Sequence, residues 1–579
     1  MVRFLLAACA LALGLWGIRW GLPSQERLAR ILAPGFETQA SLQELSDSWT
    51  QMHQRLGSNL MLNPDAGASF TGIQSVEPGW TAAPALLVNS IRSFHVRSAH
   101  EDEQSYLLAL SRMRPGRLQL NPHFFTYGGA HLYVLGAWLA LAAEVGRISL
   151  HSSLLPYLQA PAKMASLYLA GRLLSVLAFV GCVLMLLRIG RRHLGWRTGA
   201  LAGLMFALCP AAIIQAHVLK NHTVWSFLAL LTLDLSADIL EKGGLWNYAA
   251  AGAVSGLTVG AFLQGWPVCL IVAAACVLRL ACGRGATGPQ ARGLAVAAVC
   301  SIGAFFLTNP YWLLASHEVL AEMNVLRGFS TVDFTHPFLF LWNPLRHSVT
   351  SPVLVLMLAG ALWALRRGRR EPALLLCLCA FVFGLAATSL MGNVVTTRQV
   401  RYGLVWLGVG ALLASHVAVM LIQRDSRARP WLAGGLILVL ANLALQGVTY
   451  SYNFHIDATP LSTHVRSGEW IESHVPAGSS IGLLRLPQPS NAPYFRYDRY
   501  AMRFIEPRLF GNLPAAQLPE FLAVVAPDYD DRPLLEPNLS RYASVVLFER
   551  AYLVPWVRID ETSTTANPLI AIYRLRHED

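Results

Sequence analysis

The sequence predicts an all-α polytopic membrane protein with about eleven transmembrane helices, followed by a small C-terminal α/β domain. Hydrophobic residues make up 54% of the 579 residues and charged residues only 13%, about half of the charge that a soluble domain carries. Apolar runs of roughly 16 to 22 residues recur along the chain, which is the length that spans a bilayer as a helix. After residue 450 these long runs stop, and short apolar runs alternate with proline and charge, as in a soluble domain.

A series of apolar runs defines the predicted membrane region. They lie at about residues 4–20, 125–146, 165–187, 198–216, 223–240, 246–264, 267–282, 293–313, 351–365, 372–390, 403–422 and 431–449. The apolar stretch before Cys9 is too short for a cleaved lipoprotein signal, and it continues well past that cysteine. We therefore expect the first run to be a signal anchor that serves as the first membrane helix.

Arginine-rich loops between the runs predict the orientation, because short cytoplasmic loops carry an excess of basic residues. These loops lie at residues 188–197, 284–292, 366–370 and 424–429. With the N-terminus inside, all of them fall on the cytoplasmic side only if the run 125–146 does not cross the bilayer. Its residues Tyr127, His131, Tyr133 and Trp138 suit an interface. We predict that this run lies along the outer interface; the alternative is an ordinary crossing compensated elsewhere.

The chain is thus predicted to have two parts. Residues 1–450 form a transmembrane module, in which 21–124 is a large outer loop with juxtamembrane helices, and residues 451–579 form a soluble domain on the outer face. A segment of about 130 residues is long enough for a core of its own. The net charge of +12 comes largely from arginines in the short loops, so it does not indicate nucleic-acid binding. All nine cysteines lie in or beside apolar runs, which argues against disulfides or cysteine-bound zinc in the polar regions.

An acidic tetrad in the large outer loop is the first candidate for chemistry. His100, Glu101, Asp102 and Glu103 precede an apolar face at helical spacing that begins with Tyr106, so the acids are expected at the start of a short helix, where carboxylates are favoured. A carboxylate beside the bilayer can act as a base on a lipid-borne substrate when partial burial tunes its pKa. The alternative is that the acids are a solvated helix start.

Cations on or near the outer side are candidates for binding a phosphate group. Together with His100, the predicted substrate-binding residues are Arg172, Lys220, His222, Arg398, Arg401 and Tyr402. Arg172 lies about seven residues inside its apolar run, and an ionisable residue there is a functional hypothesis. Snorkelling to the interface is the alternative for Arg172. Interface anchoring is the alternative for Arg401 and Tyr402, and an interface position for His222 and its neighbour His217.

Two further charged groups are expected to be structural. Asp234 and Asp238 lie four residues apart towards the cytoplasmic end of a predicted helix, with Lys242 next, and we interpret them as a capping cluster. The outer loop 314–350 carries several histidines and acids, and it either covers the substrate site or forms a pair of juxtamembrane helices.

Several short motifs resemble those of the GT-C glycosyltransferases, of the protein mannosyltransferase and aminoarabinose transferase type (glycosyltransferase family 39-like). The stretch HEDEQSYLLALSRMRPGRLQLNPHFFTYGGAHLYVLG from His100 is similar to the first outer loop of that family, with Asp102 and Glu103 as its Asp-Glu pair and Glu101 where proline is common. Further similarities lie at residues 190–195, 209–210, 308–311, 401–402 and 469–478. The resemblance covers roughly residues 1–450.

The resemblance implies a sugar transfer on the outer face of a bacterial inner membrane. It implies a polyprenyl-phosphate monosaccharide as donor and a hydroxyl of a lipid, glycan or protein as acceptor. Asp102 would be the base, Glu103 its support, and the displacement would invert the sugar carbon. Many relatives have another aspartate in the second outer loop, but residues 217–222 contain no carboxylate here. No cofactor is therefore expected, and a divalent cation is left open because a second acidic cluster is lacking.

A transporter or flippase of a lipid-linked or anionic substrate is the alternative function. Transporters place charges near the midplane and often show internal repeats, whereas here the charges gather at the outer surface and no repeat is evident. A third alternative is an assembly protein whose outer domain binds a partner, which no feature specifically supports.

Overall fold

A computed structural model gives the fold of this protein. It describes residues 1–56, 70–329, 348–368, 370–390, 403–424, 427–525, 532–557, 559 and 564–576. The chain divides into two compact units. Unit 1 contains Met1–Trp16, Arg112–Trp138 and Gly171–Ser451, and unit 2 contains Gly17–Ser111, Leu139–Ala170 and Tyr452–Asp579. Each unit is built from segments far apart in the sequence.

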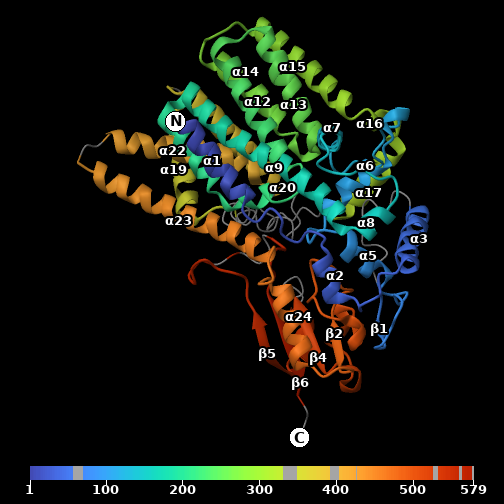
Figure 1. Ribbon diagram of the computed structural model, residues 1–579. Coiled ribbons are helices and arrows are strands. Elements are labelled where there is room, and N and C mark those ends of the chain that lie inside the picture. The colour runs from blue at the N-terminus through green and yellow to red at the C-terminus, as the bar shows by residue number, and fades with distance from the viewer. Residues whose placement is uncertain are drawn as a thin grey trace. The chain divides into compact units, whose positions relative to one another are not determined.

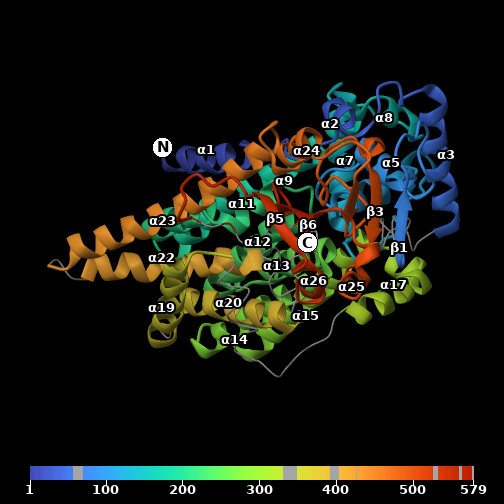
Figure 2. The same cartoon turned by 90° about the horizontal axis from the view of Figure 1, so that it is seen from below.

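Unit 1 is helical, and its helices follow the apolar runs (Figures 1 and 2). They are α1 Val2–Leu15, α7 Gly129–Glu144, α9 Pro161–Ile189, α10 Trp196–Ala207, α11 Pro210–Ala216, α12 His222–Lys242, α13 Leu245–Ala261, α14 Val268–Ala281, α15 Thr287–Thr308, α16 Tyr311–Leu314, α17 Ser316–Phe329, α19 Ser351–Arg367, α20 Pro372–Leu390, α22 Leu404–Arg424 and α23 Arg429–Asp457, of which α7, α9 and α23 continue into unit 2. The predicted fold class, helical and membrane-spanning with a small sheet in the C-terminal region, is confirmed.

Six helices of the described residues are long and apolar enough to cross a membrane. A seventh span results if α10 and α11 are taken together, although they meet at an angle of 62°. The bend lies at Cys209-Pro210, where the proline ring cannot continue the helix hydrogen bonding. Helix α7, from the run 125–146, has 16 residues, fewer than the roughly 20 that a crossing needs. Its interfacial position stays a prediction.

Small residues allow α13 and α15 to pack closely. Gly252 and Gly256 lie one turn apart on α13, and a Cβ atom at these positions would lie 2.2 Å from the carbonyl oxygen of Ala297 and 2.1 Å from that of Ser301. Glycine at this spacing lets the backbones of two membrane helices approach each other directly. Any larger side chain would force these helices apart.

Unit 2 combines helices with a mixed six-stranded sheet. Its other elements are α2 Gln25–Ile31, α3 Gln39–Leu56, β1 Ile73–Val76, α5 Val88–Val96, α6 Glu103–Arg112, α8 Leu155–Gln159, α24 Thr463–His474, β2 Ser480–Leu483, β3 Ala501–Ile505, α25 Pro507–Phe510, β4 Phe521–Val525, α26 Arg532–Leu539, β5 Tyr542–Phe548 and β6 Ile570–Leu575. The strand order is β1-β3-β2-β4-β6-β5. Strand β2 is parallel to both of its neighbours, and the other pairs are antiparallel.

The sheet draws its first strand from the segment 21–124. Strand β1 pairs with β3 in the register Ile73 to Ile505 and Val76 to Met502. Without it, β3 would be an edge strand with unpaired backbone groups. The inner strand β4 is buried along its whole length, and Leu522 and Val524 join Phe510 in the core. The segment 21–124 and the C-terminal region therefore contribute strands to the same sheet.

Candidate functional site

A buried arginine fixes the chain just before the acidic tetrad. The side chain of Arg97 is almost fully buried. Its Nη1 donates to Gln488 Oε1 at 2.9 Å, and its Nη2 donates to the carbonyl oxygen of Glu101 at 3.2 Å. Burial lowers the pKa of Arg97, while the charges of Glu101 and Asp102 act in the opposite direction. An arginine stays charged in proteins, so it supplies a fixed positive charge beside the acids.

Glu103 is the buried member of the acidic group. It is the first residue of α6 and has no exposed surface. Ser98 Oγ donates to Glu103 Oε2 at 2.5 Å and also lies 3.2 Å from the carbonyl oxygen of His100. A buried carboxylate held in this way is fixed in position. The prediction that the acids begin a short helix is confirmed.

Of the Asp-Glu pair, Asp102 is the member that a substrate can reach, because it is only partly buried whereas Glu103 is buried completely. Glu101, which precedes the pair, is exposed. The backbone N–H of Asp102 donates to His100 Nδ1 at 3.2 Å, and its carbonyl oxygen accepts from the N–H of Ser105 at 3.2 Å. The His100 ring lies edge-on to Trp20, with 6.4 Å between centroids. The turn thus holds the backbone of Asp102 at a set position and leaves the residue partly exposed.

The contacts of this turn reach residues that the sequence analysis did not identify. Arg97 and Ser98 lie three and two residues before the tetrad, so their nearness in sequence was an available signal. Gln488 and Ser490 come from the C-terminal region, and Ser490 Oγ donates to Glu101 Oε1 at 3.3 Å. Nothing in the sequence links residues almost 400 positions apart to the tetrad. We name residues 97–103 the acidic turn.

In unit 1, a second group of predicted residues gathers after the bent helix pair. Lys220 and His222 follow α11 and are both 1% exposed, and Arg172 on α9 is 0% exposed. Two neighbours of Arg172 hold α9 against this connection. Ser175 Oγ donates to the carbonyl oxygen of Val218 at 2.7 Å, and a Cβ atom on Gly171 would lie 2.1 Å from Leu219 Cδ1. Arg172 is therefore buried beside the loop that carries Lys220.

The side chains of this loop differ in what surrounds them. The Nζ atom of Lys220 lies 5.4 Å from the ring centroid of Tyr127, a distance at which the ring face attracts a cation. The ring of His222 lies 5.2 Å from that of Phe262. Asn221 Nδ2 donates to the carbonyl oxygen of Ala261 at 2.8 Å. Lys220 thus supplies a buried positive charge, whereas His222 is packed among aromatic rings.

Two acids of α17 hold the segment that leads into α7. Both carboxylate oxygens of Glu322 lie 3.0 Å from the N–H of Phe125, and they also accept from the N–H and hydroxyl of Thr126. Burial raises the pKa of Glu322, and these hydrogen bonds oppose the shift. His123 Nδ1 lies 2.7 Å from Glu318 Oε2. Their spacing of four residues on one helix face was the available signal.

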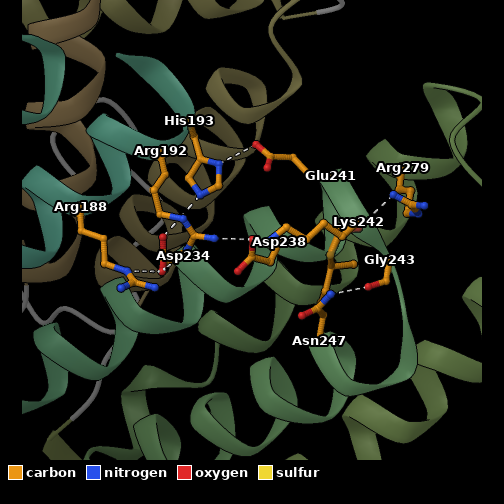
Figure 3. Close-up of polar contacts among 11 residues, drawn as sticks. Arg188, Arg192, His193, Asp234, Asp238, Glu241, Lys242, Gly243, Asn247 and Arg279 are labelled. Carbon is orange, nitrogen blue, oxygen red and sulfur yellow. Dashed lines mark hydrogen bonds and ion pairs between the residues drawn. The ribbon is translucent and has the colours of Figure 1, made fainter. Parts of the chain in front are cut away.

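The cluster of Asp234 and Asp238 is an ion-pair network among α9, the π-helical turn Gly190–Leu194 and α12 (Figure 3). Asp234 is fully buried and lies 2.9 Å from both Arg188 Nε and Arg192 Nη1. Asp238 lies 2.6 Å from Arg192 Nη2 and 3.0 Å from Lys242 Nζ. Arg192 therefore bridges the two carboxylates. The close pairing of every one of these charges is typical of a structural network.

Some predicted residues lie outside the described part of the chain. They are Arg398, Arg401 and Tyr402. Among the described residues, no group of three or more histidine, cysteine or acidic side chains is arranged to hold a metal ion.

Comparisons with known proteins follow the same line as the sequence resemblance. No family model matches the chain, and no curated protein matches it. Solved structures similar to it include the oligosaccharyltransferase of Archaeoglobus fulgidus with zinc and sulfate, at 11% identity and a TM-score of 0.38, covering 74% of this chain and 65% of that one. The archaeal oligosaccharyltransferase AglB of the same organism, with an inhibitory peptide and a dolichol-phosphate, has 11% identity and a TM-score of 0.41, covering 88% and 75%.

ArnT from Cupriavidus metallidurans bound to undecaprenyl phosphate is also similar, at 13% identity and a TM-score of 0.36, covering 98% of this chain and 97% of that one. The chain spans about two thirds of the length of the first of these structures. At identities and TM-scores this low, we draw no conclusion about function from them.

Proposed function

We propose that this protein is a GT-C membrane glycosyltransferase. It would transfer a monosaccharide from a polyprenyl-phosphate donor to a hydroxyl acceptor on the outer face of a bacterial inner membrane. The observation that supports this most is the acidic turn, in which Asp102 is partly exposed while Arg97 and Glu103 beside it are buried and hydrogen-bonded. A fixed, accessible carboxylate in the outer loop of a membrane protein suits a general base.

Asp102 acts as the base in the proposed reaction. It accepts the proton of the acceptor hydroxyl while that oxygen forms a bond to the anomeric carbon of the donor sugar. The bond from this carbon to the phosphate oxygen breaks, and the polyprenyl phosphate leaves with the electron pair. Attack opposite to the leaving group inverts the anomeric carbon. Glu103 positions the turn through Ser98 rather than touching the substrate.

Cations bind the phosphate group in this proposal. Arg172 and Lys220 are buried basic residues in unit 1, and we propose that both contact the phosphate of the donor. Charge-assisted hydrogen bonds to a phosphate are among the strongest in proteins. We keep His100, His222, Arg398, Arg401 and Tyr402 as predicted contacts of the donor or acceptor.

Transport of an anionic or lipid-linked substrate is the second candidate. The observation in its favour is that Lys220 directly follows a helix pair bent by 62°, because transporters form substrate sites at broken helices. Asp102 has no required part in that function. The two candidates therefore differ in how they respond to loss of this one carboxylate.

The decisive experiment is a sugar-transfer assay with radiolabelled polyprenyl-phosphate sugars. Membranes would contain the wild type, Asp102→Asn or the neighbouring Glu101→Gln at equal expression. We expect transfer by the wild type and Glu101→Gln and none by Asp102→Asn. Equal transfer by Asp102→Asn would remove this residue from the reaction. No transfer from any donor, combined with substrate movement that is lost in Arg172→Gln, would establish transport instead.

A further inference from the structure

Unit 2 contains a cavity of about 540 Å³. The residues of the acidic turn, 97–103, are not among those that line it. Its walls come from the chain around α2, the first two turns of α9 and the chain from the end of α23 into α24. Ala162, Ala165 and Leu169 give the α9 wall an apolar character, and the remaining walls are mainly polar. Cavities of this size hold small organic molecules rather than single ions.

The charges around the cavity are balanced. Arg19, Arg27 and Arg30 line it together with Glu26 and Asp457. Glu469, which is not part of the lining, pairs with Arg30 Nη1 at 2.7 Å, so three carboxylates accompany three guanidinium groups. A strongly charged ligand would meet as much repulsion as attraction here.

The most buried of these arginines donates its hydrogen bonds to backbone carbonyl groups. Arg27 Nη2 donates to the carbonyl oxygens of Phe94, at 2.5 Å, and Arg97, at 2.8 Å, and Nη1 donates to that of Gly21 at 3.3 Å. Phe94 is in the last turn of α5, and Arg97 directly follows it. Carbonyl groups at the C-terminal end of a helix stabilise a positive charge. Arg27 therefore needs no anion from the cavity.

Two buried polar atoms of the lining residues have no partner in the part of the chain that the structure describes. One is Arg30 Nε, which is a donor, and the other is His464 Nε2. His464 is 1% exposed, its Nδ1 lies 2.8 Å from the carbonyl oxygen of Ala492, and its ring stacks on Tyr494. A carbonyl only accepts, so Nδ1 carries the proton. Burial lowers the pKa of His464 to about 4, so the ring is neutral and Nε2 is an acceptor.

A ligand that satisfies both atoms must accept from Arg30 and donate to His464. Hydroxyl groups do both, whereas an ionised phosphate or carboxylate oxygen only accepts. Several hydroxyl groups on one uncharged molecule also match the balanced charges and the mixed lining. We propose that this cavity binds a neutral saccharide of one or two rings. Binding of this kind goes beyond the transfer reaction proposed above and does not depend on it.

The test is a direct binding measurement on the full-length protein in phosphatidylcholine nanodiscs, since maltoside detergents carry a sugar themselves. The probes are the neutral methyl glycosides of glucose, galactose, mannose and N-acetylglucosamine and the disaccharide maltose, followed by saturation-transfer difference NMR. Glycerol 3-phosphate is the anionic comparison. We expect saturable binding of at least one neutral sugar and a much weaker response to glycerol 3-phosphate.

Variants at the two unpaired atoms connect this binding to the cavity. His464→Asn keeps a donor for Ala492 and removes Nε2, and Arg30→Lys keeps the charge that pairs with Glu469 and removes the Nε–H. Each is expected to weaken sugar binding about tenfold, the usual effect of losing a buried hydrogen bond. His474→Asn on the exposed part of α24 and Arg508→Lys are the matched controls and should bind like the wild type.

A third variant keeps the proposal testable if either of the first two variants fails to fold. Ser166→Leu adds bulk to the cavity wall without touching the network around Arg27, and it should abolish sugar binding. Melting temperature and gel filtration establish that each variant is folded. Three results would overturn the proposal: no neutral sugar binds, glycerol 3-phosphate binds in place of the sugars, or sugar binding is unchanged in every folded cavity variant.

Discussion

The acidic turn of unit 2 and the ion-pair network of unit 1 both concentrate carboxylates, but they use them differently. In the network, Asp234 is completely buried and two arginines lie 2.9 Å from its carboxylate. In the acidic turn, the buried carboxylate is Glu103, and the neighbouring Asp102 is partly exposed. The difference shows that a dense acidic sequence is not itself a site. What matters is whether one carboxylate is held and left accessible.

This comparison also separates function from stability. A carboxylate whose charge is neutralised by close partners has little capacity to take up a proton at neutral pH, because those partners stabilise its charged form. A partly exposed carboxylate on a rigid turn can be approached by the hydroxyl group of a substrate. We therefore expect substitutions of Asp102 and of the side chains that hold it to change the reaction, and substitutions in the network to change the stability.

The largest expected effect is that of Asp102→Asn on the rate of sugar transfer. Loss of a general base lowers the rate about 10²- to 10⁴-fold, and the amide has the same shape as the carboxylate. The melting temperature should stay within a degree or so of the wild type, since surface changes of this kind cost about 0.5 kcal/mol or less. The measurement is the initial transfer rate per folded protein. A loss of stability parallel to the loss of rate would break the comparison.

Acid should destabilise the protein through His464, whose surroundings differ from those of His193 in the network. His193 Nδ1 lies 2.6 Å from Glu241 Oε1. The ring of His464 instead stacks on Tyr494, and the positive charge of Arg27 disfavours its protonation. Burial lowers the pKa of His464 to about 4, so between about pH 6.5 and 4 only the unfolded chain takes up this proton. The free energy of unfolding therefore decreases as the pH is lowered, by about 3 kcal/mol at pH 4.

The measurement is the melting temperature from pH 7.5 to 4.5 for the wild type and His464→Asn. The variant should lose less stability on acidification than the wild type does. Parallel curves for the two proteins would contradict the assignment of a neutral, buried ring at this position.

Asp234→Asn should lower stability without changing the transfer rate of the folded protein. Removing one partner of a buried ion pair costs about 3–5 kcal/mol. Here the side chains of Arg188 and Arg192 are 56% and 28% exposed, so solvent compensates in part and we expect about 2 kcal/mol. Thermal unfolding in nanodiscs measures this. Glu241→Gln, at a carboxylate of the same helix whose side chain is 40% exposed, is the control and should cost about 0.5 kcal/mol.

The smallest expected effect is that of Ser98→Ala, which removes the hydroxyl that donates to Glu103. A hydrogen bond to a buried charge contributes about 1.5 kcal/mol or more, and the turn should also hold Asp102 less firmly. We expect a modest loss of stability together with about a tenfold lower transfer rate. Ser111→Ala, at an exposed serine near the end of α6, should change neither. A lower stability with an unchanged rate would show that Glu103 is only structural.

The sequence predicted the helical part of the fold well, because apolar length and arginine-rich loops are properties of single segments. It also predicted the acidic group at the start of α6, whereas for Arg172 it left a functional position and snorkelling open. The pairing of β1 with β3 was not predicted. Ile73 and Ile505 are more than 400 residues apart, and a four-residue strand has no pattern strong enough to identify its partner.

The sequence by itself determined that this chain spans a membrane and carries acids and arginines in its polar loops, since hydropathy and charge act locally. The tertiary structure decided which of these charges are paired, which are buried and which can meet a substrate. Asp102 and Glu103 are adjacent in the chain, yet only the folded turn, held by Arg97, Ser98 and Gln488, distinguishes them. Accessibility depends on every neighbour in space, and residues such as Gln488 join the turn only when distant segments fold together.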